Sequence, residues 1–157
     1  SQVTASQNAA EAYLYGGSAY LSMDFNAHFR WVNTVNYTYG RIKTDTTPYP
    51  LDHIAPVFGK SSLQFSMKKF RAEAFVLYSG WKRLKDYNLV GEDNIDNATP
   101  LGMPAWMTFN VRTAYQVNKY LQIQAAVENI LDQNYRVFAS NIGAPGRNFV
   151  LTVRGTF

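Results

Sequence analysis

Apolar and polar residues alternate along most of the chain. Alternation at a period of two predicts β-strands with one apolar and one polar face. Alternating segments of about ten residues, separated by turn residues, are typical of strands that cross a membrane in a β-barrel. The pattern predicts seven such strands, at residues 11–25, 28–40, 58–68, 70–83, 105–117, 120–129 and 147–157.

Short and long connections alternate between the predicted strands. The short connections lie at 26–27, 68–69 and 118–119, and the long ones at 41–57, 84–104 and 130–146 contain all six prolines. In outer-membrane barrels the short turns face the periplasm and the long loops face outside. We therefore expect the last strand to run inward and Phe157 to end at the periplasmic side.

The predicted apolar face consists of odd-numbered residues in every strand except 70–83, where it consists of even-numbered ones. Aromatic residues gather at both ends of this face. They are Phe25, Phe29, Trp31, Tyr115 and Phe157 near the short turns, and Tyr13, Tyr15, Tyr37 and Tyr39 near the long loops. Because amphipathic rings prefer the level of the lipid headgroups, they predict two membrane-interface girdles around an aliphatic belt.

The opposite face is rich in Gln, Asn and Thr and is expected to line the lumen of the barrel. Phe75 and Leu77 interrupt it, and we expect them to pack on something inside. A soluble barrel with the same period would place its apolar face inward. Such a barrel would cover its outside with Lys and Glu, which are sparse here.

Composition supports the membrane interpretation. Charged residues make up 17% of the chain, against about 25% in an ordinary soluble domain. No run approaches the roughly 18 apolar residues that a transmembrane helix needs. The absence of cysteine excludes disulfide scaffolds and thiol catalysis. No signal peptide is present at Ser1, so an outer-membrane protein would here be a mature chain or a fragment.

Two stretches near the end of the chain carry turn chemistry. Residues 128–136 read ENILDQNYR, and residues 143–147 read GAPGR before the final strand. Asn129, Asp132 and Asn134 favour turns and local hydrogen bonds from side chain to backbone. We expect Tyr135 to anchor the turn at the membrane boundary. These residues are interpreted as structural and not as ligand-binding.

These stretches, together with PLDHIAP at 50–56, PAWMTFNVR at 104–112 and YQVNK at 115–119, resemble the C-terminal end of TonB-dependent outer-membrane receptors. The resemblance implies an all-β fold, an antiparallel up-and-down transmembrane β-barrel of 22 strands with an N-terminal plug. Residues 1–157 would then be the C-terminal part of the barrel, with the plug absent. Seven strands would leave two open edges, which hydrocarbon does not tolerate. Gly155 departs from the family, which more often has a bulky apolar residue there.

The resemblance also implies a function. A receptor of this family would take up a scarce nutrient (a ferric siderophore, haem, cobalamin or a glycan) with energy coupled through TonB. It would not be an enzyme, and we expect no cofactor and no bound metal. Its partners would be outer-membrane lipid and lipopolysaccharide, the rest of its own barrel and plug, TonB through the missing N-terminal part, and the barrel-assembly machinery through the last strand. Nucleic acid is not expected.

Candidate substrate-facing residues lie in the long loops. They are Tyr49, His53, Arg83 and Tyr87. The alternative function is a complete small barrel of the eight-stranded class, acting as an adhesin or structural anchor. An outer-membrane phospholipase is a third possibility, but neither histidine lies beside a convincing nucleophile.

The remaining motifs favour structural roles. Gly59-Lys60-Ser61 lacks the first glycine of a phosphate-binding loop. His28 and His53 are more simply hydrogen-bonded residues than metal ligands. Glu92, Asp93 and Asp96 lack the spacing of an EF-hand loop. The basic residues that follow Trp81, namely Lys82, Arg83 and Lys85, would suit lipopolysaccharide phosphates or an anionic substrate.

Overall fold

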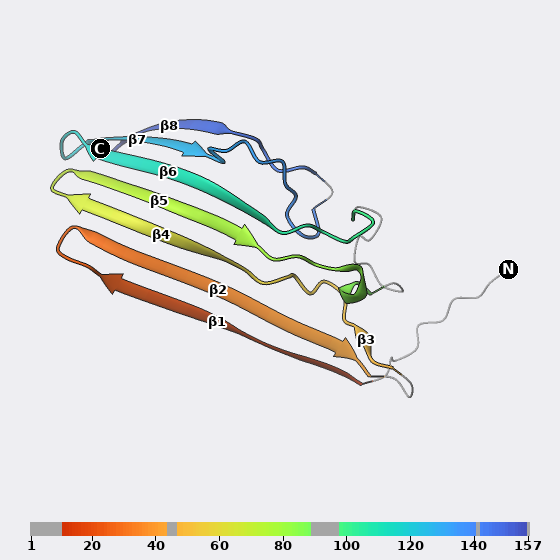
Figure 1. Ribbon diagram of the computed structural model, residues 1–157. Helices are drawn as coiled ribbons and strands as arrows, with labels where there is room; N and C mark the ends of the chain where they lie inside the picture. The colour runs from red at the N-terminus through yellow and green to blue at the C-terminus, as the bar shows by residue number, and fades with distance from the viewer. Residues whose placement is uncertain (1–10, 44–46, 89–97, 141, 157) are drawn as a thin grey trace.

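The computed structural model describes residues 11–43, 47–88, 98–140 and 142–156. They form one antiparallel sheet (Figure 1), whose long strands are β1 (Ala12–Asp24), β2 (Phe29–Ile42), β4 (Phe58–Met67), β5 (Phe70–Ser79), β6 (Trp106–Gln116), β7 (Leu121–Glu128) and β8 (Asn148–Gly155). The two-residue strand β3 (Tyr49–Pro50) pairs with the end of β2, and a 3₁₀ turn, η1, spans Leu84–Asp86. In the part of the chain that the structure describes, no helix is long and apolar enough to cross a membrane.

The predicted all-β antiparallel fold is confirmed, and most strand ends agree with the prediction to within two residues. The largest difference is at β5, predicted to continue to residue 83 but ending at Ser79. Beyond it, Gly80 N donates to Val57 O, and Lys82 forms an isolated bridge with Met103. The chain has therefore left the strand before η1 begins. Phe157 lies outside the described residues.

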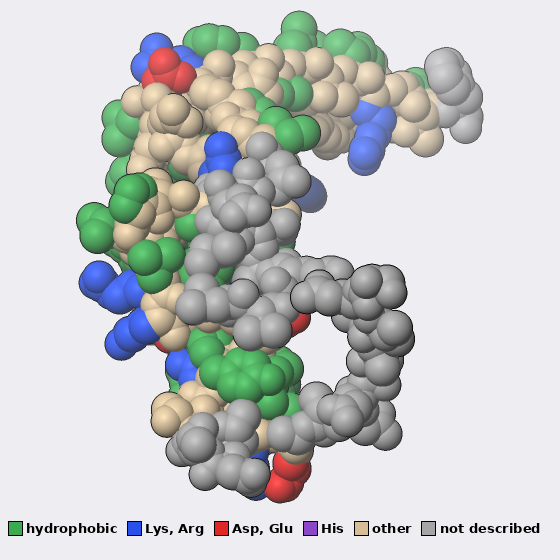
Figure 2. All heavy atoms as spheres, turned by 90° about the vertical axis from the view of Figure 1, so that its right-hand side faces the viewer, with side chains coloured by type: hydrophobic (Ala, Val, Ile, Leu, Met, Phe, Trp, Pro, Cys, Tyr) green, Lys and Arg blue, Asp and Glu red, His purple; other side chains and the backbone are tan. Residues whose placement is uncertain are grey.

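Long strands adjacent in the sequence are neighbours in the sheet, in the order β1-β2-β4-β5-β6-β7-β8. Viewed from the end that carries the long connections, the sheet curves into an open arc around a hollow (Figure 2). Among the described residues, β1 and β8 are the two edges of this arc and do not pair with each other.

The short turns are held by the residue types that the sequence places there. Asn26 Oδ1 accepts hydrogen bonds from the backbone N–H groups of His28 and Phe29. Asn118 Oδ1 accepts the equivalent pair from Tyr120 and Leu121. Asparagine favours turns for this reason, since its side chain replaces a backbone acceptor. The third short turn instead places Lys68 in the left-handed region, at a φ of 49°.

The strand register keeps the two faces of the sheet separate. In β4, β5 and β6, for example, Gln64 lies opposite Glu73, and Glu73 lies opposite Arg112. Every charged residue of the seven long strands except Arg41, near the loop end of β2, falls on this polar face. The neighbouring residues Leu63, Ala74 and Val111 share the other, exposed face.

One aromatic side chain ties three strands together. Tyr78 of β5 lies opposite Gly59 of β4, and its Oη donates to the carbonyl oxygen of Thr34 in β2 at 3.2 Å. A Cβ atom at position 59 would overlap both Thr34 O and the Tyr78 hydroxyl. Glycine is therefore required at position 59, because the tyrosine ring crosses β4 there to reach β2.

Candidate functional site

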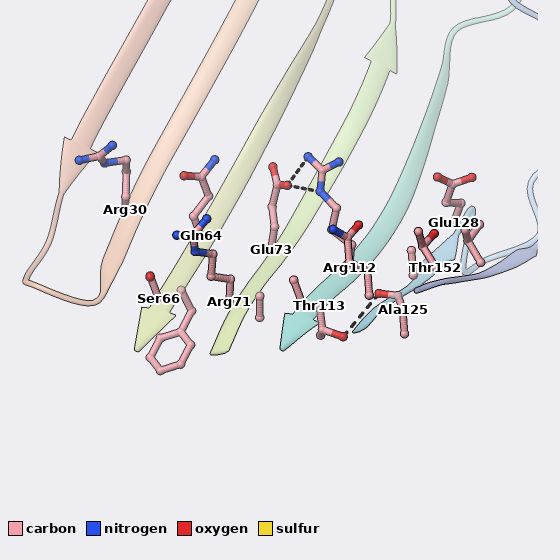
Figure 3. A pocket seen from close by; sticks show the side chains of 16 residues that line it. Arg30, Gln64, Ser66, Arg71, Glu73, Arg112, Thr113, Ala125, Glu128 and Thr152 are labelled. Carbon is pink, nitrogen blue, oxygen red and sulfur yellow. Dashed lines mark hydrogen bonds and ion pairs between the residues drawn. The ribbon is translucent and has the colours of Figure 1, made fainter. Parts of the chain in front are cut away.

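The concave face of the sheet is a polar wall. A pocket of about 680 Å³ on this face takes polar side chains from β2, β4, β5, β6, β7 and β8; these include Arg30, Gln64, Glu73, Arg112, Gln124, Glu128 and Thr152. Figure 3 shows Arg30, Gln64, Glu73 and Arg112 projecting side by side from neighbouring strands. The predicted lumen-lining residues of these strands are thus brought together on one surface.

A buried carboxylate organises the centre of this wall. Glu73 is 8% exposed. Its Oε1 lies 2.7 Å from Lys60 Nζ, and its Oε2 accepts from both Nε and Nη2 of Arg112. Charge-assisted pairs of this kind are among the stronger hydrogen bonds in proteins. One carboxylate therefore fixes two cations that come from the strands on either side of it.

Phe75 packs against the same two cations, as its place on the polar face required. Its ring centroid lies 4.4 Å from Lys60 Nζ and 5.1 Å from Arg112 Cζ. The face of an aromatic ring attracts cations. The expectation that Phe75 packs on something inside is therefore confirmed, and the partners are charged side chains of the wall.

Other side chains of the wall also pair with one another. Arg30 forms an ion pair with Asp24, with Nε and Oδ1 2.6 Å apart. Gln122 Nε2 donates to Gln116 Oε1 at 3.0 Å, and Gln124 Nε2 donates to Gln122 Oε1. Within the described residues, no group of three or more His, Asp or Glu side chains is placed to hold a metal ion. The wall offers hydrogen bonds and paired charges to whatever enters the hollow.

The predicted substrate-facing residues are not equivalent. Tyr49 is half-buried in β3, His53 is exposed at a φ of 59°, and Arg83 is exposed with Cζ 5.3 Å from the Trp81 ring centroid. Tyr87 is only 2% exposed and packs edge-on against Phe138 at 6.5 Å. The expectation that Tyr87 faces substrate is corrected, because its ring lies inside the folded loops.

The predicted basic cluster after Trp81 is also changed by the structure. Arg83 and Lys85 are exposed, but Lys82 is 3% exposed and lies in the interior with Tyr87. Lys82 therefore leaves the surface cluster. Nothing in the sequence distinguishes Lys82 from its basic neighbours, since the nearer of its two aromatic contacts in space, Phe138, lies far along the chain.

The aromatic residues expected at the membrane interface lie in two groups at opposite ends of the convex face. Near the short turns, Phe65 lies 4.9 Å from Phe29 and 6.2 Å from Phe70, which is opposite Tyr115. Phe65 therefore belongs to the aromatic group at the turn end. Phe25 is exposed at the same end, next to the first short turn. Their contact with lipid stays a prediction.

At the loop end, Tyr15 lies 5.1 Å from Tyr39 and 6.4 Å from Tyr13. Arg41 is the one strand charge on this face; its Cζ lies 4.5 Å from the Tyr39 ring centroid, and its Nη2 pairs with Asp86 Oδ1 at 3.2 Å. Tyr37 is exposed on the same face. Trp31, at the turn end, is half-buried and donates from Nε1 to Ser61 Oγ at 2.9 Å.

The remaining polar candidates have structural contacts or lie elsewhere. His28 Nδ1 is 3.0 Å from Ser66 O, which ties two strand ends at the turn side. Glu92, Asp93 and Asp96 lie outside the described residues.

The ENILDQNYR stretch at 128–136 has a structural role, as predicted: its side chains join the two ends of the connection between β7 and β8. Asn129 is 3% exposed at a φ of 48°, and its Nδ2 donates to Gln133 O at 2.8 Å and Pro145 O at 3.2 Å. Asp132 Oδ1 accepts from the backbone N–H of Arg147 at 2.7 Å. These bonds tie the segment after β7 to the segment before β8.

Tyr135, near the end of the same stretch, packs against the start of β6. Its ring lies 4.3 Å from the ring of Trp106. Burial raises the pKa of the Tyr135 phenol, and the nearby Glu128 carboxylate raises it further. The phenol therefore stays neutral at physiological pH, as suits a packing residue.

Comparison with known proteins agrees with this geometry. The family model "TonB dependent receptor-like, beta-barrel" matches residues 1–130. Among solved structures, the chain is similar to the copper transporter OprC, with a TM-score of 0.77 and 20% identity; the match covers 93% of this chain and 24% of that one. A search of curated protein sequences found no significant match. The chain belongs to the TonB-dependent receptor β-barrel family, whose members are transporters and not enzymes.

Proposed function

We propose that the full-length protein is an outer-membrane receptor that takes up a scarce nutrient with energy delivered through TonB. The nutrient class is a ferric siderophore, haem, cobalamin or a glycan. Family membership supports the outer-membrane location and the coupling to TonB. The observation that carries the proposal is the division of one sheet into a convex apolar face and a concave face with nearly all of its strand charges.

In this proposal residues 1–157 are the C-terminal part of a 22-stranded barrel, and the plug lies elsewhere in the full chain. The polar wall around Glu73 faces the lumen, where it meets the plug and the passing nutrient. Strands β1 and β8 pair with the rest of the barrel, and β8 is offered to the barrel-assembly machinery. At the outer rim, around Trp81, the barrel meets the phosphates of lipopolysaccharide.

The loop residues Tyr49, His53 and Arg83 make the first contact with the nutrient. They offer a phenol, an imidazole and a guanidinium, which together suit an anionic or aromatic cargo. The exposure of His53 and Arg83 supports this role, and Tyr87 no longer belongs to the set.

The test compares uptake by cells that carry the full-length receptor with and without TonB. The probes are a ferric siderophore, haem, cobalamin and an oligosaccharide, each radiolabelled. We expect one of them to accumulate only when TonB and the proton-motive force are both present. Accumulation of none of the four, or accumulation that is unaffected by loss of TonB, would contradict the proposal.

The loop assignment is tested on the probe that accumulates. Replacing Tyr49, His53 and Arg83 by Ala should raise its half-saturating concentration about tenfold, as expected when several polar contacts are lost. Lys119→Ala, on a short turn at the opposite end of the sheet, is the matched control. An unchanged half-saturating concentration in the triple variant would sink the assignment.

A further inference from the structure

One buried side chain contacts all three long connections. Lys82 lies in the second connection, just after β5, and is 3% exposed. Its Nζ donates to the carbonyl oxygen of Ile54 in the first connection at 2.7 Å. The same atom lies 4.2 Å from the ring centroid of Phe138 in the third connection. The Tyr87 ring, from the second connection, is 4.9 Å away.

The surroundings of this ammonium match its chemistry. Burying a charged group is costly unless the site compensates the lost hydration. Here a carbonyl oxygen accepts one of its protons, and two aromatic faces attract the positive charge. Tyr87 and Phe138 also contact each other edge-on, at an interplanar angle of 69°. The arrangement is a cation cage built from three separate segments.

The backbone of Lys82 is fixed as well as its ammonium group. Its backbone N–H donates to Met103 O at 3.0 Å, and Met103 N donates back to Lys82 O at 2.8 Å. Met103 leads into β6 and is itself buried. The backbone of Lys82 is thus held in place, and its ammonium contacts groups from the other two connections, Ile54 O and the Phe138 ring.

We propose that Lys82 is a positioning residue whose ammonium holds the three long connections together as one unit. In the full receptor this unit would form the mouth of the uptake route, a statement that rests on the proposed function. Loss of the cation should free the connections from one another and leave the strands intact. Lys85, three residues away and exposed, provides a control of the same charge.

The test measures cleavage by chymotrypsin of the external connections of the full-length receptor, in cells that lack TonB and with no cargo added. Lys82→Ala removes the volume and charge of n-propylammonium. We expect about tenfold faster cleavage, because cleavage follows the population of open loops. Added n-propylammonium should restore protection and n-propanol should not. Lys85→Ala should be cleaved at the wild-type rate, and cold electrophoresis should show folded barrels throughout.

Wild-type protection in Lys82→Ala, or equal rescue by propanol, would overturn the proposal. If Lys82→Ala does not fold, Lys82→Met keeps most of the length and the apolar stem of the side chain and loses the ammonium, with its charge and its hydrogen bond to Ile54 O. Fast cleavage of this variant supports the cage, and wild-type protection overturns it. Because the assay involves neither TonB nor cargo, its result is independent of uptake. Absence of uptake by the wild-type receptor would contradict the proposed function alone.

Discussion

The two faces of this sheet come from the same strands, but the concave face buries polar side chains and the convex face exposes apolar ones. On the concave face Ser62, Thr108 and Asn110 are almost inaccessible, at 2%, 2% and 5% exposed. On the convex face the adjacent Leu63 and Phe109 are 43% and 42% exposed. A soluble sheet that packs one face on a core shows the reverse. The difference teaches that each face is matched to its own surroundings.

The two faces must therefore be stabilised by different forces. Apolar residues on the convex face gain little from contacts within the chain, and in the proposed barrel lipid would supply the apolar environment that they need. Polar residues on the concave face are held by ion pairs and hydrogen bonds centred on Glu73. Substitutions of equal chemistry should consequently have unequal effects on the two faces.

The largest contrast is expected from the same substitution at neighbouring positions of β4. Leu63→Arg places a charge on the convex face, which the proposed function puts against lipid, and should lower the free energy of unfolding by about 2–4 kcal/mol. Gln64→Arg, on the concave face beside Glu73, should change it by less than about 1 kcal/mol. The measurement is urea unfolding of the full-length barrel in phospholipid bilayers, followed by electrophoretic mobility. Equal losses would break the distinction between the faces.

A smaller loss is expected from the centre of the wall. Glu73→Gln leaves Lys60 and Arg112 without their shared carboxylate and should cost about 1–3 kcal/mol in the same assay. Glu128→Gln is the matched control, because Glu128 is exposed and, among the described residues, accepts one hydrogen bond, from Asn148 at 3.3 Å. A Glu73→Gln variant as stable as the control would show that the concave face does not depend on its central carboxylate.

The smallest effect concerns a hydrogen bond on the convex face. Trp31→Phe removes the bond to Ser61 and should cost about 0.5–1.5 kcal/mol. Ser61→Ala and the double variant complete a double-mutant cycle that isolates the pair. A coupling energy near zero would mean that the bond contributes nothing, and that the convex face depends on apolar character alone.

The alternation of single residues made most of the fold predictable. Gln64 and Leu63 reveal their faces because a strand directs neighbours to opposite sides. The turns at Asn26 and Asn118 are local, so their hydrogen bonds follow from residue type. Strand β3 was missed, since two residues carry no period and Tyr49 is set by pairing with Ile42.

The loop interior could not be predicted for a physical reason. Tyr87 lies in a polar connection and was expected to be exposed, but its environment is created by Phe138 in another connection. The burial of Lys82 depends likewise on Ile54 O, a backbone atom that any residue would supply. Contacts between irregular segments have no periodicity, so the side chains that meet there are known only from the folded chain.

The Tyr78 crossing bears on how such a wall can deform. Its hydroxyl reaches Thr34 by passing over Gly59, so β5 is tied to a strand that is not its neighbour. Sliding of β5 along β4 would break a bond to β2 as well as the ladder between the two neighbours. This part of the sheet therefore resists sliding between its strands. A channel lined by the concave face would have to widen by moving segments that this bond does not link.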